Sequence, residues 1–248
     1  MESRSFIIAL DGPAASGKGT LARNLAKHYG FAYLDTGSLY RGVAWVMLDR
    51  GLDPADAEAA ADAARNFSLV QIEGAAIRTA EVGAASSVVA ANSAVRAGLM
   101  DFQRRFAEDP PPAGSQPPSA RAKNRARGGA ATLGVRGAVL DGRDIGTVVC
   151  PHAPVKFFVT ASPEVRAGRR WAELKEAGSR KTLQEVAGEL AERDARDAAR
   201  DDAPMTRAGD AELLDTTHLS IDAAFAAARR VIDGVLERWI GENDPPQF

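Results

Sequence analysis

The sequence predicts an α/β fold in which helices cover both faces of a parallel β-sheet. Five short apolar runs, typical of buried strands, are spaced along the chain, and helical patterns lie between them. Strands that alternate with helices favour a parallel sheet, because each crossover helix returns over one face. A glycine-rich turn directly after the first run supports the same class. With 248 residues, 45% of them apolar, the chain fits one large domain.

The first expected strand is Phe6–Leu10, which contains no polar residue and ends at Asp11 and Gly12. An uninterrupted apolar run that ends in a glycine turn is typical of a strand buried on both faces. Four later runs have a similar character and complete a five-stranded sheet. They are Phe31–Leu34, Ala138–Leu140, Val155–Val159 and Leu213–Leu214.

The expected helices occupy the segments between these runs. Leu21, Leu25 and Ala26 recur at helical spacing up to Gly30, and glycine is suited to the end of a helix. The other long helical patterns are Ser38–Leu48, Pro163–Ala177, Thr182–Arg200 and Ile221–Trp239.

Two stretches interrupt the alternation of strands and helices. A stray strand pattern at Ser68–Gly74 lies between two alanine-rich helical segments, Ala55–Arg65 and Asn92–Ala107, which indicates a small insertion. The second stretch, Glu108–Gly134, consists mainly of Pro, Ala, Gly, Ser and Arg. Such a segment buries too little apolar surface to offset the entropy of ordering it, so we expect a flexible excursion.

The composition excludes several classes of protein. A formal net charge of −2 argues against a protein that coats nucleic acid. The single cysteine, Cys150, rules out an internal disulfide framework and suits a reducing compartment. No apolar run approaches the about 20 residues of a membrane span, and the first run lacks a signal-peptide cleavage pattern. We therefore expect a cytoplasmic monomer with no nucleic-acid or membrane partner.

The strongest local signal is the loop that joins the first strand to the first helix. Glycine lets the backbone N–H groups of such a loop point inward, and the positive end of the following helix faces the same place. Lys18 adds a full charge for the β- and γ-phosphate oxygens. The context predicts a nucleoside-triphosphate site rather than a turn beside a solvated lysine, although the loop alone would serve a GTPase or an ATP-driven machine equally well. Its residues are Gly12, Pro13, Ala14, Ala15, Ser16, Gly17, Lys18, Gly19 and Thr20.

Two polar segments follow the second and third strands and place further charges beside this loop. They are Asp35–Arg41 and Asp141–Thr147, and each contains an arginine close to a carboxylate. The carboxyl ends of parallel strands meet at one edge of a sheet, where ligands bind. These segments therefore predict a site for a second, anionic substrate.

The helical segment Thr182–Arg200 predicts a further part of this site. Leu183, Val186 and Leu190 share one face at about 100° per residue, and four polar residues continue that face. A face that changes from apolar to charged indicates a helix that passes from the core into a polar cleft; the alternative is a solvated helix end with weak ion pairs. The four residues are Arg193, Arg196, Asp197 and Arg200.

Basic residues of the preceding helix predict a mobile lid. Three arginines recur there, and two more basic residues follow Gly178, whose flexibility suits a hinge. Such a lid would neutralise charge on a transferring phosphoryl group, whereas the alternative is a set of ordinary exposed side chains. The lid residues are Arg166, Arg169, Arg170, Arg180 and Lys181, and we expect Arg166 and Arg170 to be catalytic.

At these motifs the sequence resembles the bacterial cytidylate kinases, which are P-loop nucleoside-monophosphate (NMP) kinases. The resemblance covers nearly the whole chain outside Glu108–Gly134. It implies a five-stranded parallel P-loop sheet flanked by helices, a small NMP-binding insertion and a helical lid. It also implies phosphoryl transfer from ATP to CMP and dCMP. The matching segments are Gly12–Thr20, Leu34–Arg41, Asp141–Val149, Ala153–Lys156, Arg193–Arg200 and Leu214–Thr217.

The resemblance implies a division of one kinase domain, residues 1–248, into four parts. The expected core comprises 1–52, 136–162 and 205–241; the NMP-binding insertion is 53–107, the flexible low-complexity insertion is 108–135, and the lid with its following helix is 163–204. Between Ser68 and Arg78 the chain is shorter than the family's small acceptor-side sheet, so we expect one hairpin to be missing.

The resemblance also implies roles for individual residues. The segment that receives the acceptor nucleotide contributes Thr36, Tyr40 and Arg41. The acceptor phosphate is held by Arg41, Arg143 and Arg193, which join Lys18, Arg166 and Arg170 as the expected catalytic set. The cytosine ring is read by Ser86, Arg96 and Asp144, and the sugar is held by Asp197 and Arg200.

The implied chemistry is consistent with these residue types. Cytosine has an exocyclic amine beside two acceptors, so a carboxylate suits the amine and an arginine suits the acceptors. Uracil would direct a carbonyl at Asp144 and should be disfavoured. We expect Mg²⁺ to bridge the ATP phosphates, with Asp141 as a ligand through a water molecule.

Three alternatives stay open at this point. The runner-up function is that of another small-substrate kinase, such as one for AMP, UMP or shikimate, and the contrasting one is that of a regulatory nucleotide-binding protein that has lost transfer activity. A nucleic-acid-dependent ATPase rests on the basic insertion alone, whose charges also suit a solvated loop. The basic residues of that insertion are Arg121, Lys123, Arg125 and Arg127.

Overall fold

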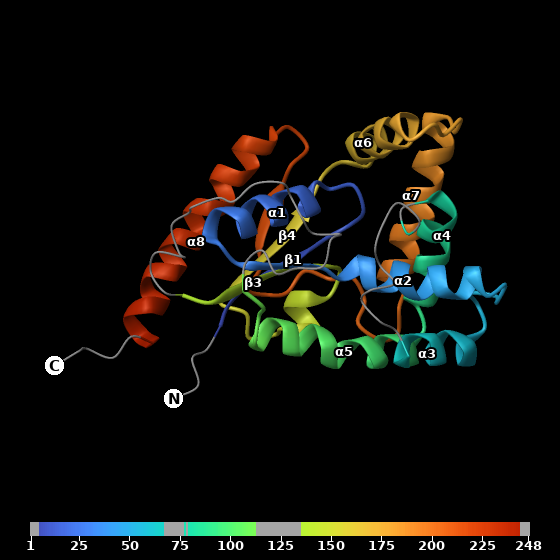
Figure 1. The fold of residues 1–248 in the computed structure, drawn as a ribbon. Coiled ribbons are helices and arrows are strands. Elements are labelled where there is room, and N and C mark those ends of the chain that lie inside the picture. Colours follow the sequence, from blue (N-terminus) through green and yellow to red (C-terminus); the bar gives the residue numbers. More distant parts are fainter. Residues whose placement is uncertain (1–4, 67–76, 78, 113–134, 244–248) are drawn as a thin grey trace.

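The computed structural model describes residues 5–66, 77, 79–112 and 135–243. Its centre is a five-stranded sheet in which all four strand pairs are parallel (Figure 1). The strand order is β2-β3-β1-β4-β5. The predicted parallel five-stranded fold is therefore confirmed. The strands are β1 (Phe6–Asp11), β2 (Ala32–Asp35), β3 (Gly137–Asp141), β4 (Val155–Thr160) and β5 (Glu212–Asp215).

The two faces of the sheet bury the side chains of β1 to β4, whereas the edge strand β5 is mostly exposed. Phe6, Ile8 and Leu10 of β1 pack against α1 (Lys18–Tyr29) and α8 (Ile221–Asn243). Ala9 points to the opposite face, toward α5 (Ser93–Glu108). Figure 1 shows α1 and α8 on one side of the sheet and α5 on the other. Burial on both faces explains why β1 to β4 carry nearly continuous apolar runs.

Four helices on the acceptor side share a second apolar core. They are α2 (Thr36–Asp49), α3 (Ala57–Arg65), α4 (Ala80–Val89) and α5, and side chains such as Val43, Met47 and Val95 fill the space between them. Helix α4 was not anticipated; it begins after Thr79, whose hydroxyl accepts a hydrogen bond from the Val82 N–H. The predicted strand at 68–74 lies outside the described residues.

Helices α6 (Pro163–Glu176) and α7 (Leu183–Ala198) form a pair at one end of the molecule (Figure 1). Their contact is a separate apolar cluster that includes Ala167, Leu174 and Val186. A capping box at Thr182 begins α7, and Gly178 in the connection has a φ of 84°, which glycine adopts without strain. These helices carry the predicted lid, whose motion stays a prediction.

The ends of the predicted low-complexity insertion lie close together. Glu108 is the last residue of α5 rather than the start of a flexible segment. Arg136 donates to Asp109 at 2.6 Å, and the Ser5 hydroxyl donates to the Glu108 carbonyl at 2.8 Å. Residues 113–134 lie outside the described part of the chain. None of the helices in the described ranges is long and apolar enough to cross a membrane.

Candidate active site

The carboxyl ends of β1, β2 and β3 border a polar cavity of about 350 Å³. The phosphate loop lines one end, and α2, α4, α5, α6 and α7 contribute further side chains. The cavity thus lies at the edge of the sheet where the sequence predicted ligands to bind.

The glycine-rich loop has the backbone that the sequence predicted. Gly12 has a φ of 139°, and a Cβ atom there would lie 2.0 Å from the Val159 carbonyl oxygen. Gly17 has a φ of 86° and precedes α1, and among the described residues no side chain caps that helix. The Ala14 carbonyl accepts from Arg166 at 3.2 Å and the Ser16 carbonyl from the Thr216 hydroxyl at 2.8 Å. These bonds fix the loop and leave the start of α1 open to an anion.

Lys18 begins α1 and lines the cavity, although only 8% of its surface is exposed. Burial, followed by the nearby charge of Arg143, lowers the pKa of its ammonium to about 8; Asp141 and Asp35 act in the opposite direction. The group therefore carries its charge at neutral pH and lacks a full set of solvent hydrogen bonds. A polyanion in the cavity would replace them.

Four arginines from different elements meet in the middle of the cavity. Burial and the charges of its arginine neighbours lower the pKa of Arg193 to about 9, and within the described ranges its Nε atom has no hydrogen-bond partner. Guanidinium groups held this close repel one another unless an anion lies between them. The arrangement is therefore suited to a phosphate. The four are Arg41, Arg143, Arg170 and Arg193.

Asp197 of α7 orients two of the cavity arginines. Arg143 Nε donates to its carboxylate at 2.9 Å, and Arg200 donates to the other oxygen. Burial alone would raise the pKa of Asp197, but Arg143, Arg200 and Arg193 hold it below its usual range. The buried carboxylate thus directs the guanidinium of Arg143, whose Nη1 also donates to the Gly142 carbonyl at 3.1 Å. Within the part of the chain that the structure describes, the Nη2 donors of Arg143 have no hydrogen-bond partner and suit a ligand.

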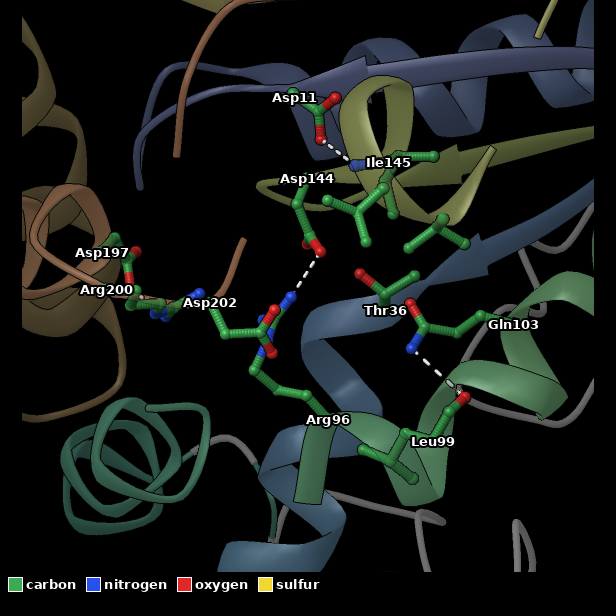
Figure 2. A network of polar contacts seen from close by, with 12 residues as sticks. Asp11, Thr36, Arg96, Leu99, Gln103, Asp144, Ile145, Asp197, Arg200 and Asp202 are labelled. Carbon is green, nitrogen blue, oxygen red and sulfur yellow. Dashed lines mark hydrogen bonds and ion pairs between the residues drawn. The ribbon is translucent and has the colours of Figure 1, made fainter. Parts of the chain in front are cut away.

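The far end of the cavity is formed by Arg96 of α5 and Asp144, which follows β3 (Figure 2). Arg96 is 1% exposed and donates from Nη2 to Asp144 at 2.5 Å and from Nε to Asp202 at 3.3 Å. Its Nη1 has no partner in the described part of the chain. Ser86 and Tyr40 also line this end. A carboxylate, an arginine and two hydroxyls here can bind a planar polar ring.

Most of the predicted site residues line this one cavity. The lining does not include Gly12, Pro13 and Ser16 of the loop, Arg166, Arg169, Arg180 and Lys181 of the predicted lid, or Arg196 of α7. Arg166 lies outside its lining; it is 7% exposed and forms a 2.6 Å ion pair with Asp194 behind the phosphate loop. Arg196 is exposed, so the charged face of α7 contributes Arg193, Asp197 and Arg200 but not this fourth residue. The Thr36 hydroxyl donates to the Asp141 carbonyl at 2.8 Å.

Sequence reasoning did not assign a role to several residues beside the cavity. Asp11 bonds the backbone after Asp144, and Gln103 lies beside Tyr40. Asp202 pairs with Arg96, and the Tyr33 hydroxyl donates to Asp141 at 2.9 Å. Only Asp11 gave a signal in the sequence, since it is a polar residue at the end of an apolar strand.

The fold and the cavity together define a class of enzyme. A parallel P-loop sheet with a phosphate cradle at one end of a cavity and a set of arginines next to it is suited to two phosphorylated substrates. This combination is that of a P-loop kinase that acts on nucleoside monophosphates.

Comparison with known proteins specifies the family. The family model described as cytidylate kinase matches residues 8–112 and 118–233. A cytidylate kinase of Caulobacter sp. (strain K31) is 47% identical over 95% of this chain and 97% of its own length. Those of Brucella suis biovar 1 (46%, over 95% and 96%) and Xanthobacter autotrophicus (48%, over 92% and 97%) are similar to the same extent. The chain belongs to the cytidylate kinase family.

The match corrects one expectation from the sequence. We expected the family resemblance to stop at the low-complexity segment from 108 to 134. The family model instead resumes at residue 118 and leaves only 113–117 between its two matched parts. Most of that segment is therefore matched by the family model.

Proposed function

We propose that this chain transfers the γ-phosphoryl group of ATP to CMP and dCMP, giving ADP with CDP or dCDP. The observation that carries the proposal is that one cavity brings together the phosphate loop, four arginines and the Arg96–Asp144 pair. The charges of Arg143 and Arg193 act on Lys18 of the loop, whereas Arg96 acts on Arg200. Membership of the cytidylate kinase family supports the same activity.

The proposed donor site is the loop from Gly12 to Thr20. The amides at the start of α1 would hold the ATP phosphates, and Lys18 would place its charge on the β- and γ-oxygens. Arg169 donates to both the hydroxyl and the carbonyl oxygen of Thr216, at 3.0 and 2.8 Å, and Thr216 in turn holds the Ser16 carbonyl. This chain of bonds keeps the loop in shape before ATP arrives, which lowers the entropic cost of binding.

The acceptor phosphate would lie among Arg41, Arg143 and Arg193. Phosphoryl transfer depends on alignment and charge neutralisation, and a phosphate acceptor is already an anion, so no general base is required. The arginines would hold the attacking oxygen in line with the γ-phosphorus and reduce the repulsion between the two substrates. Arg170 of α6 also lines the cavity and would contribute when the lid closes.

The nucleobase would lie against Arg96 and Asp144. The carboxylate would accept from the exocyclic amine of cytosine, and the arginine would donate to the ring nitrogen and carbonyl. Ser86 is buried and lines the same cavity, and Asp197 and Arg200, which also line it, would hold the sugar. Uracil presents a carbonyl where cytosine presents the amine, which would leave Asp144 facing an acceptor. We therefore expect selection against UMP.

A Mg²⁺ ion suits the oxygen donors beside the cradle. Magnesium in kinases is usually held by one or two carboxylates together with substrate phosphates. The described residues contain no cluster of three or more acidic, histidine or cysteine side chains suited to a metal, so Asp141 fits this sparse arrangement. Burial, with Asp35 nearby, raises the pKa of Asp141 to about 6, and a cation would offset both. When bound, the ion would neutralise phosphate charge; Asp141 would hold it through a water molecule.

Lid closure, assembly and location complete the proposal. The α6–α7 pair would close over the substrates and exclude water, which protects ATP from hydrolysis. We propose that the enzyme acts as a monomer. We place it in the cytoplasm, where ATP and CMP are present and where the free, buried Cys150 stays reduced.

A coupled assay of ADP formation tests the proposed function. The purified chain is given ATP and Mg²⁺ with CMP, dCMP, UMP, AMP or shikimate, and Lys18→Met serves as the control for contaminating kinases. We expect turnover with CMP and dCMP to exceed that with every other acceptor. Equal use of UMP or AMP would contradict the base assignment, and the absence of ADP with all acceptors would leave only a nucleotide-binding protein.

A further inference from the structure

A short π-helix, η5 (Ile145–Val149), begins directly after Asp144. The first N–H groups of any helix need an acceptor, and an aspartate at the preceding position usually supplies one from its own side chain. Asp144 does not do so in the described structure, since its side chain makes no capping bond. Its carboxylate instead lies 2.5 Å from Arg96 Nη2, facing the cavity.

The missing cap comes from a distant part of the chain. Asp11, the last residue of β1, accepts from the Ile145 N–H with one oxygen and from the Gly146 N–H with the other, both at 2.7 Å. Figure 2 shows Asp11 directed at Ile145 while Asp144 is directed away toward Arg96. Only 4% of Asp11 is exposed, so water does not replace it as the acceptor.

Asp11 packs tightly against Gly146. A Cβ atom at Gly146 would lie 3.3 Å from Asp11 Oδ2 and 3.2 Å from Lys156 Cδ. Asp11 also directly precedes Gly12, the first residue of the phosphate loop. The same residue therefore joins the donor loop to the segment that carries the base-binding carboxylate.

We propose that Asp11 is a positioning residue for recognition of the nucleobase. By capping η5 in place of Asp144, it leaves the Asp144 carboxylate free to face Arg96 and the amine of the acceptor base. Without Asp11, the Ile145 and Gly146 amides lose their acceptor, and the Asp144 side chain turns back to cap its own helix, as aspartate does elsewhere. The inference rests on the proposed CMP kinase function.

The test is the substitution Asp11→Asn, which keeps the size of the side chain. Its amide oxygen can accept one N–H, but its NH₂ group meets the other N–H as a second donor. We expect the ratio of kcat/KM for CMP to that for UMP to fall by about tenfold, which corresponds to one lost polar contact. The KM for ATP should stay within about twofold, because the phosphate loop keeps its own anchors.

A double mutant separates positioning from general damage. If Asp11 acts through Asp144, adding Asp11→Asn to Asp144→Ala lowers the CMP-to-UMP ratio no further, since residues that act as one unit are not additive. The matched control is Asp233→Asn, which weakens the 2.6 Å bond from the Tyr29 hydroxyl, far from the cavity. It should lower the melting temperature and leave the ratio unchanged.

Several outcomes would overturn the inference. They are a wild-type ratio in Asp11→Asn, an equal loss with CMP and UMP, or a further fall of the ratio in the Asp144→Ala background. If Asp11→Asn does not fold, Asp11→Ser, which keeps one oxygen acceptor, is assayed in the same way and judged by the same outcomes. A wild-type enzyme without any preference for CMP would instead refute the proposed function.

Discussion

Because the arginines of the cavity lie close together, we predict that Arg193 lowers the free energy of unfolding of the ligand-free protein. We also predict that Arg193 is necessary for activity. The variant Arg193→Met keeps the length of the side chain and removes its charge. The pKa of Arg193 is lowered from 12.5 to about 9, mainly by burial and then by Arg143. A lowered pKa in a basic group means that the folded state disfavours its charged form, and at neutral pH that cost is present in full.

The size of the effect follows from this shift. At about 1.4 kcal/mol per pKa unit, the lowered pKa of Arg193 limits the cost of its charge to the folded state to at most about 5 kcal/mol. The side chain is only partly buried, and solvent and relaxation screen repulsion between arginines, so we expect about 1–2 kcal/mol. Without anions, Arg193→Met should therefore raise the free energy of unfolding by this amount and the melting temperature by about 2–6 °C. Its kcat/KM for CMP should fall about 100-fold, because a charged contact to the acceptor phosphate is lost.

Thermal melts in a phosphate-free buffer, followed by the coupled assay, test both parts. The control is Arg196→Met, on the same helix, whose side chain is exposed outside the cavity. Inorganic phosphate or CMP should stabilise the wild type more than Arg193→Met, because only the wild type has the full set of guanidinium groups. A variant that is less stable than the wild type without anions would refute the reasoning, as would activity equal to that of Arg196→Met.

Three further changes test other parts of the site. Asp144→Ala should lower kcat/KM for CMP by at least about 100-fold while the dissociation constant of an ATP analogue changes less than about twofold; equal losses would contradict its role at the base. Gly12→Ala should abolish ATP binding and lower the melting temperature, because the new Cβ would lie 2.0 Å from a carbonyl oxygen. A variant with the melting temperature and the ATP affinity of the wild type would contradict this prediction. Since the pKa of Lys18 is lowered to about 8, raising the pH from 7 to 9.5 removes its charge and should weaken binding of a nonhydrolysable ATP analogue to the free enzyme; calorimetry that shows constant affinity over this range would exclude such a titration.

Strands β1, β3 and β4 were predictable because they are largely buried and therefore nearly continuous in apolar residues, whereas the edge strand β5 is largely exposed and left only the pair Leu213–Leu214 as a signal. Helix α4 was not predictable, since its sequence Ala-Glu-Val-Gly-Ala-Ala-Ser-Ser-Val-Val has small or apolar residues on every face and no clear period. The π-helix was also missed. Its first turn depends on a carboxylate that lies 134 positions earlier in the chain, and local patterns carry no information about such a partner.

The phosphate loop was predictable because its function depends on consecutive residues. The ion pairs around Arg96 were only partly predictable from the sequence. Family resemblance placed Arg96 beside Asp144, but Asp202 is 106 positions away from Arg96, and its position depends on where the chain runs after α7. Arg166 has the sequence context of an exposed lid residue, yet Asp194 of the neighbouring helix and the Ala14 carbonyl hold it in a buried position. Only the packing of α6 on α7 decides between these two environments.

The apolar cluster between α6 and α7 is separate from the cores on either face of the sheet. If the pair turns as a rigid unit, as the predicted lid requires, it breaks the contacts of Arg166 and Arg169 with Ala14 and Thr216 but leaves the large side chains beneath the sheet buried. We therefore expect the free energy needed for the turn to be small compared with that of global unfolding. Amide hydrogens of α6 and α7 should accordingly exchange with solvent sooner than those of β1 and β3. An enzyme built in this way can release its products often while most of its structure stays intact.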